Sequence, residues 1–139
     1  MVKRADVVLD WADGTHLFAL KGKQIEELEA ICFNPGTGTK GVGLGAIYMR
    51  VMGGAWHRSD LREVIRLGLI GGGMGAVEAE RRCRTYVDDV PLAETMADGT
   101  SRLTPDSPLA VAQAILSAAV VGVERSEPGE SRPGETPEN

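Results

Sequence analysis

The chain has 139 residues and a formal net charge of −5, which is enough length for one domain. Hydrophobic residues make up 42 % and aromatic residues only 4 %, so the core has to be built from aliphatic side chains and Met. The acidic balance argues against general affinity for nucleic acid or for an anionic membrane surface, because both depend on Lys and Arg. No signal peptide precedes the first strand and no apolar run reaches the ~20 residues of a bilayer span, so we expect a soluble cytoplasmic protein.

Residues 5–21 alternate as a β-hairpin does. Asp13 and Gly14 form a two-residue sequence typical of a type I′ turn, in which both central residues need a positive φ. With these two as the loop, one apolar face carries the cross-strand pairs Trp11–His16, Leu9–Phe18 and Val7–Leu20. Two strands alone are marginal in water, so we expect this face to lie on helices.

Five helical segments follow, because apolar residues recur there at spacings of three and four. They cover residues 22–33, 44–52, 60–70, 76–90 and 108–124. Asp60 with Glu63 predicts a capping box, and Ser107 followed by Pro108 predicts another helix start. Residues 34–43 and 97–107 are polar and rich in turn formers, which indicates loops.

The fold class predicted is therefore α+β, with an N-terminal β-hairpin packed on a bundle of about five α-helices. A single domain is expected over residues 5–124. From Arg125 the composition changes to Pro, Gly, Ser and Glu, which cannot bury enough surface to offset the entropy of ordering. Residues 125–139 are predicted to be a disordered acidic tail.

Five of the 18 glycines lie in residues 68–75, GLIGGGMG. The run from Gly71 to Ala76 fits GxGxxA, a tolerated form of the dinucleotide fingerprint, and leaves a small nucleotide-binding regulator using Gly71–Gly75 as one alternative. That fingerprint requires a preceding β-strand, whereas an amphipathic helix precedes this run. We expect a joint between packed helices, with Gly71 in a left-handed conformation after the helix and Gly72 and Gly73 reversing the chain.

Catalytic and metal-binding patterns are thin. Cys32 and Cys83 lack a CxxC spacing and fall at apolar positions, so buried thiols are expected. His16 and His57 lie in unrelated segments, with no ligand spacing around them. We predict no catalytic residue, no metal and no cofactor, and therefore no enzyme.

Three phrases carry a resemblance to a known family: HRSDLREVIRLGLIGGGM at 57–74, AVEAERRCRTYVDDVPLAE at 76–94 and PLAVAQAILSAAVVGVE at 108–124. They resemble the small tail proteins of gene transfer agents and siphophages. This family is grouped with phage tail assembly chaperones and is also labelled as tail tube proteins. Residues 97–107 look like an insertion relative to it.

The resemblance implies a non-enzymatic role in tail morphogenesis, as a chaperone that binds the tape measure protein and tail tube subunits. It implies no nucleic acid or membrane partner, and a place in the host cytoplasm or in the particle tail. A structural tail tube or minor tail component retained in the particle is the alternative, and self-association is left open. A tape measure is helical and amphipathic, so we expect an apolar groove, with the candidate contacts Leu69, Ile70, Leu109, Ala112, Leu116 and Val120. The competing interpretation of residues 109–123 is a fully buried core helix.

Overall fold

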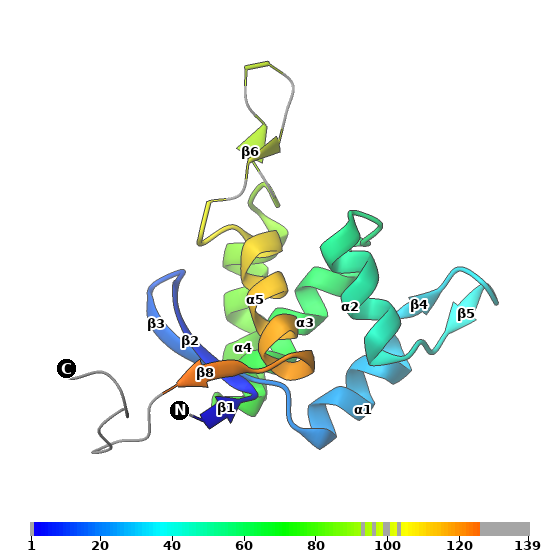
Figure 1. Cartoon of the computed structure of the whole chain (residues 1–139). Coiled ribbons are helices and arrows are strands. Elements are labelled where there is room, and N and C mark those ends of the chain that lie inside the picture. Colours follow the sequence, from blue (N-terminus) through cyan, green and yellow to red (C-terminus); the bar gives the residue numbers. More distant parts are fainter. Residues whose placement is uncertain (1, 93, 96, 99–100, 103, 126–139) are drawn as a thin grey trace, which may run out of the picture.

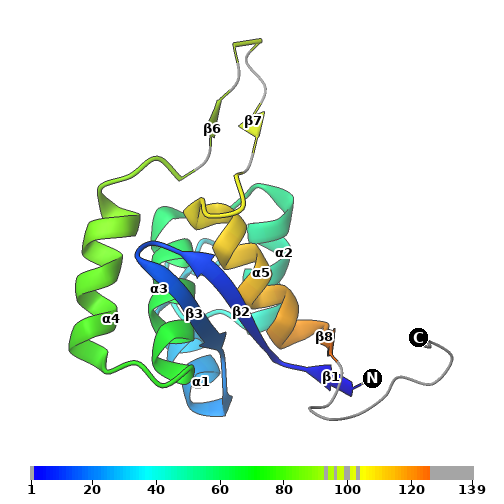
Figure 2. The same cartoon turned by 90° about the vertical axis from the view of Figure 1, so that its left-hand side faces the viewer.

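The computed structural model describes residues 2–92, 94–95, 97–98, 101–102 and 104–125. A hairpin of β2 (Asp6–Trp11) and β3 (Gly14–Ala19) packs on α3 (Arg58–Gly71) and α5 (Pro108–Val120), as Figure 2 shows from the hairpin side. The remaining helices are α1 (Gly22–Ile31), α2 (Leu44–Gly53) and α4 (Ala76–Cys83), and α4 continues into a π-helical turn, η1 (Arg84–Asp88). The α+β prediction, a hairpin on five helices, is confirmed.

Three shorter strand pairs complete the fold (Figure 1). They are β1 (Val2–Arg4) with β8 (Val123–Arg125), β4 (Phe33–Asn34) with β5 (Thr39–Lys40), and β6 (Glu94–Thr95) with β7 (Ser101–Arg102). The β4–β5 segment falls largely within residues 34–43, for which the sequence predicts a loop. Asn34 organises it, because its carboxamide accepts from the N–H of Gly36 at 2.9 Å and donates to the carbonyl of Gly41 at 3.0 Å.

The register of the β2–β3 hairpin differs from the prediction by two residues. Trp11 lies opposite Gly14, so the loop is Ala12–Asp13, with Ala12 at φ 58°, and Gly14 belongs to β3. The observed register places Asp10 opposite Thr15, whose hydroxyl donates to the Asp10 carboxylate at 2.7 Å. Because the shift is even, every side chain keeps its predicted face.

The glycine run ends α3 and lies against β3. Gly73, at φ 112°, is the left-handed residue, and Met74 donates to the carbonyl of Leu69 at 2.9 Å, as in a Schellman motif. The prediction that Gly71 takes this conformation is wrong, because α3 continues through it. A Cβ at Gly71 would lie 1.7 Å from the carbonyl oxygen of Ala19, and one at Gly72 2.0 Å from that of Leu17. These two glycines are needed for the close approach of a strand to the helix end.

Both central helices begin at polar side chains. Ser107 accepts from the N–H of Ala110 at 3.2 Å, with Pro108 as the first residue of α5, as predicted. α3 begins at Arg58, so Asp60 is the third residue of the helix and accepts from the N–H of His57 at 2.8 Å. The N-cap is therefore His57, three residues before the predicted cap at Asp60. The Asp60 side chain instead reaches back to the N-cap residue from inside the helix.

Candidate interaction surface

Most of the contact residues expected from the sequence lie in the core. Leu69, Leu109, Ala112 and Leu116 are buried, Ile70 is half-buried and Val120 is 42 % exposed. α5 packs against α3, α2 and β2, so its buried side is already occupied by this chain. The core-helix interpretation fits that side of α5, and a surface for a partner has to be sought among other residues.

The solvent side of α2 has no charged side chain. Its five exposed residues are Gly45, Ala46, Met49, Met52 and Gly53. Met49 is 68 % exposed and Met52 43 % exposed, although helices of soluble domains usually carry charged and polar residues outward. Met is flexible and polarisable, which suits a surface that packs against varied partners.

The fold of this chain does not explain why Gly45 and Gly53 are glycines. Nothing lies within 4 Å of a Cβ at either position, and neither has a positive φ. Glycine within a helix costs about 0.5–1 kcal/mol relative to Ala. Gly45 and Gly53 are the second and the last residue of α2, so this cost is smaller for them, and small residues spaced along an exposed helix allow another backbone to approach closely.

The outer strip of α5 is uncharged as well and continues this surface. Gln113 lies at the border and donates to the carbonyl of Val51 at 3.4 Å, which places the two helices side by side (Figure 1). We call the combined surface the α2–α5 face. Its residues are Gly45, Ala46, Met49, Met52, Gly53, Ala110, Gln113, Ala114, Ser117 and Val121.

The one charged residue within α2 is turned away from this face. Arg50 extends to α3, where its guanidinium binds both carboxylate oxygens of Asp60 at 2.9 and 2.6 Å. It also donates to the carbonyl of Phe33 at 2.8 Å. The α2–α5 face therefore keeps no charge of its own.

Charged residues gather instead around α4, on the opposite side of the molecule from α5 and α2 (Figure 2). Arg62 of α3 lies between Glu80, at 2.7 Å, and Asp88, at 2.8 Å. Its guanidinium holds the pKa of Glu80 below the ordinary value, and Glu80 followed by Asp88 raises the pKa of Arg62. This side of the molecule is therefore solvated and ion-paired.

The tip of the hairpin is bound to α4 by the same chemistry. Arg82 contacts Asp13 at 2.9 Å and also pairs with Glu78. Hydrogen bonds from Arg82, and then from His16, lower the pKa of Asp13. Asp13 was expected only as a turn residue, and the structure adds this contact between distant parts of the chain.

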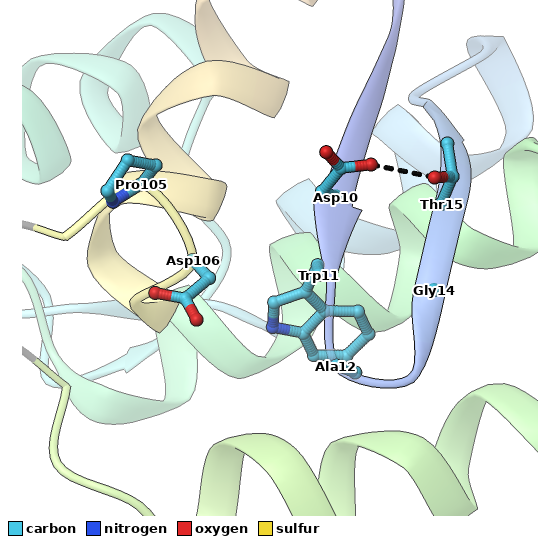
Figure 3. Close-up of a pocket in the computed structure, with 7 residues that line it drawn as sticks. All are labelled: Asp10, Trp11, Ala12, Gly14, Thr15, Pro105 and Asp106. Atoms are coloured by element: carbon cyan, nitrogen blue, oxygen red, sulfur yellow. Dashed lines mark hydrogen bonds between the residues drawn. The ribbon is translucent and has the colours of Figure 1, made fainter.

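A hollow of about 430 Å³ opens where the hairpin tip meets the start of α5 (Figure 3). We call it the acidic recess, because Asp10 and Asp106 are its charged lining residues. Its complete lining is Asp10, Trp11, Ala12, Gly14, Thr15, Pro105 and Asp106. Trp11 is buried beneath it and makes edge-on contacts with His16, Phe18 and Tyr86.

Three N–H groups of the glycine run are used to end α3 and are not directed at a ligand. The N–H groups of Gly72, Gly73 and Met74 donate to carbonyls of α3 at 2.9–3.0 Å. A phosphate-binding loop needs such groups directed at the ligand, so the geometry gives no support to the nucleotide-binding alternative. Within the ranges that the structure covers, no group of three His, Cys, Asp or Glu could hold a metal ion.

None of the helices that can be assessed here is both long and apolar enough to span a bilayer. Cys32 and Cys83 are free and buried, and burial raises the pKa of each thiol to about 12. Both therefore behave as the small core residues expected from the sequence.

Comparison with known proteins identifies the family. A family model described as "Phage tail tube protein, GTA-gp10" matches residues 4–98, a span that includes the hairpin and α1 to α4 and stops before α5. No curated protein and no solved structure matches the chain. The match covers more than half of the sequence and confirms the resemblance seen in its phrases, so the chain belongs to this family of phage and gene transfer agent tail proteins.

Proposed function

We propose that this chain is a tail assembly chaperone that binds the tape measure protein and helps to recruit tail tube subunits. Its family membership supports the broader role on which this proposal builds, a structural or morphogenetic role in a phage or gene transfer agent tail, in contact with other tail proteins. The observation that carries this proposal is the α2–α5 face. An uncharged pair of helices with exposed Met side chains suits the apolar stripe of an amphipathic helix.

The high proportion of helix also favours a chaperone over a subunit that forms the wall of the tail tube. Closed rings of tube subunits need broad β-sheets or barrels with many paired strands. Each sheet among the described residues has two strands, and helices form the core.

Co-expression with the tape measure protein, followed by pull-down and a solubility assay, tests the proposal. We expect a complex, and we expect Met49→Glu to weaken it roughly tenfold or more, because a carboxylate would be buried against an apolar helix. Val77→Glu is the matched control, since Val77 is 73 % exposed on α4, away from the α2–α5 face. Tape measure solubility that is indifferent to this chain would defeat the chaperone proposal.

A retained structural component of the tail remains the second candidate, and the family description, which names a tail tube protein, favours it. Purified particles distinguish the two. A chaperone is expected to be absent from them or present in traces, whereas a tube or minor tail component is present in a fixed ratio to the other tail proteins.

A further inference from the structure

Charged residues of opposite sign lie near the two ends of α5, outside the α2–α5 face itself. Beyond the C-terminal end of α5, the Lys3 side chain lies across Gly122, with its Cδ 3.3 Å from the position of a Cβ there, and Arg4 follows Lys3 in β1. Both basic residues are exposed, but Arg4 is paired with Asp6 at 3.4 Å, so Lys3 is the residue that we consider for a contact with another copy. The acidic recess, with Asp10 and Asp106, lies at the N-terminal end of α5 (Figure 3). The charges at one end therefore complement those at the other.

Consider a two-fold axis that lies in the plane of this face and runs perpendicular to α5. The second copy that it generates has α5 in the opposite direction, so the C-terminal end of α5 in one copy lies over the N-terminal end of α5 in the other. Elements to one side of α5 in the first copy meet the same elements of the second copy. β1 and the β2–β3 hairpin lie on one side of α5, and α2 lies on the other (Figure 1). The basic end of each copy would thus lie over the acidic recess of the other copy, and α2 over α2.

The outer stripe of α2 matches the same symmetry. Gly45, Met49 and Gly53 follow one another at intervals of four residues, so they lie along one line of the helix. Reversing the helix about Met49 exchanges the two glycines. In an antiparallel pair, Met49 of one copy meets Met49 of the other, and each Gly45 lies opposite a Gly53. A two-fold contact requires this kind of self-complementary surface.

We propose that a second copy of this chain covers the α2–α5 face, in an antiparallel two-fold dimer in which Lys3 of each copy enters the acidic recess of the other. The inference rests on the proposed function in one respect: the covered face is also the face for the tail partner, so the dimer is the resting form that the partner displaces. Helices of 10 and 13 residues are about 15 and 20 Å long. Their footprint is below the ~800 Å² per partner of a standard interface, so the dimer exchanges readily.

Sedimentation velocity on the whole chain, from roughly 5 to 500 μM, spans the micromolar dissociation constant expected of a small interface. The wild-type chain should move from monomer to dimer across this range. Met49→Glu should remain a monomer, whereas Val77→Glu should dimerise as the wild type does. A wild-type chain that is monomeric throughout, or a dimer that is unchanged by Met49→Glu, overturns the proposal.

A charge exchange tests the antiparallel arrangement. Lys3→Glu and Asp106→Lys should each weaken the dimer about tenfold, because each places like charges opposite one another. The double variant should recover most of the wild-type affinity, since every contact then has opposite charges again. Single variants without effect, or a double variant that is weaker than either single one, overturn this arrangement.

Tape measure binding by the Lys3→Glu variant separates the dimer from the proposed function. This variant keeps the α2–α5 face and binds the competing copy more weakly, so it should capture the tape measure protein at least as well as the wild type. A wild-type chain that dimerises as described but never binds the tape measure protein defeats the chaperone proposal and leaves the dimer standing. A chain that is monomeric at every concentration, yet loses tape measure binding on Met49→Glu, defeats the dimer and leaves the chaperone standing.

Discussion

Arg50 and Asp60 form a two-pronged ion pair that joins α2 to α3 inside the molecule, with Nε–Oδ2 at 2.9 Å and Nη2–Oδ1 at 2.6 Å. Asp60 is completely buried, and the Arg50 side chain is 11 % exposed. The carboxylate also accepts from the N–H of His57. The position of α2, and with it one half of the α2–α5 face, thus depends on a charge pair rather than on apolar contact alone.

Removal of one partner of this pair should be costly. Asp60→Ala leaves a largely buried guanidinium without its carboxylate, and we expect a loss of about 3–5 kcal/mol in the free energy of unfolding. Urea denaturation measures it. Arg81→Ala, which removes an exposed pair with Glu78, is the control and should cost about 0–1 kcal/mol. Equal losses in the two variants would contradict the structural role of the buried pair.

Two kinds of glycine should respond in opposite directions to alanine. Gly72→Ala puts a methyl group 2.0 Å from the carbonyl oxygen of Leu17, and since backbone cannot move aside cheaply, we expect a loss of at least 1–3 kcal/mol, as for overpacking. Gly45→Ala enters open space in α2 and should be neutral or stabilise by up to about 1 kcal/mol. Thermal melts of the two variants against the wild type check this contrast. A neutral Gly72→Ala would show that β3 does not lie so close to α3.

Acid should weaken the fold through its ion-paired carboxylates. Arg62 lowers the pKa of Glu80, and Arg82 with His16 lowers the pKa of Asp13, from ordinary values of 4.5 and 3.8. Because the folded values are the lower ones, this stabilisation is fully present above the unfolded pKa values. It is lost as the pH falls through the folded values. The urea midpoint of the wild type should therefore decrease as the pH is lowered from about 6 to 3. The decrease should be less steep in Glu80→Gln, because that variant has lost one of the titrating carboxylates. Glu26→Gln, on the exposed side of α1, is the control and should keep the wild-type slope.

The two thiols should be inert in the native chain. Burial raises the pKa of Cys32 and Cys83 to about 12, and thiolate is the reactive form. A disulfide reagent at pH 8 should label neither cysteine until guanidinium is added, and should then label both. Val77→Cys on exposed α4 provides a thiol that reacts at once. Rapid labelling of the native wild type would show that the core around α3 opens.

Sequence patterns predicted the helices and the hairpin well, because apolar spacing reports directly which side of an element is buried. The hairpin register escaped them for the same reason. A slip of two residues leaves every side chain on its face, so burial cannot distinguish the two pairings. The observed register comes with the polar pair Asp10–Thr15 and with the contact between Asp13 and Arg82. The Asp13–Arg82 contact joins residues that are 69 positions apart in the sequence, so local spacing does not reveal it.

Because α5 is apolar nearly all round, its spacing alone does not show which side faces the core. Leu109 and Leu116 were expected to meet a partner, yet both are buried, whereas Val120 is exposed. The α2–α5 face that we propose as the partner surface has its sequence signal in α2, where Met49 and Met52 fall off the core side of the helix. The exact ends of α3 are set by contacts with distant parts of the chain, which the spacing of nearby residues does not reveal. One example is the carbonyl of Ala19, which lies beside Gly71.

The β1–β8 pairing brings Arg4 opposite Val123, and Val2 opposite Arg125, so the first and last strands that the structure describes lie next to each other. A short linker from β8 to β1 could join them, and the chain could be reopened at the β4–β5 turn to give a circular permutant with the same core. The β1 end also adjoins the basic edge of the α2–α5 face. A bulky fusion at that end would hinder partner access sterically, whereas one at the β4–β5 turn would project into open solvent, which makes that turn the better position for an affinity tag or a fluorophore.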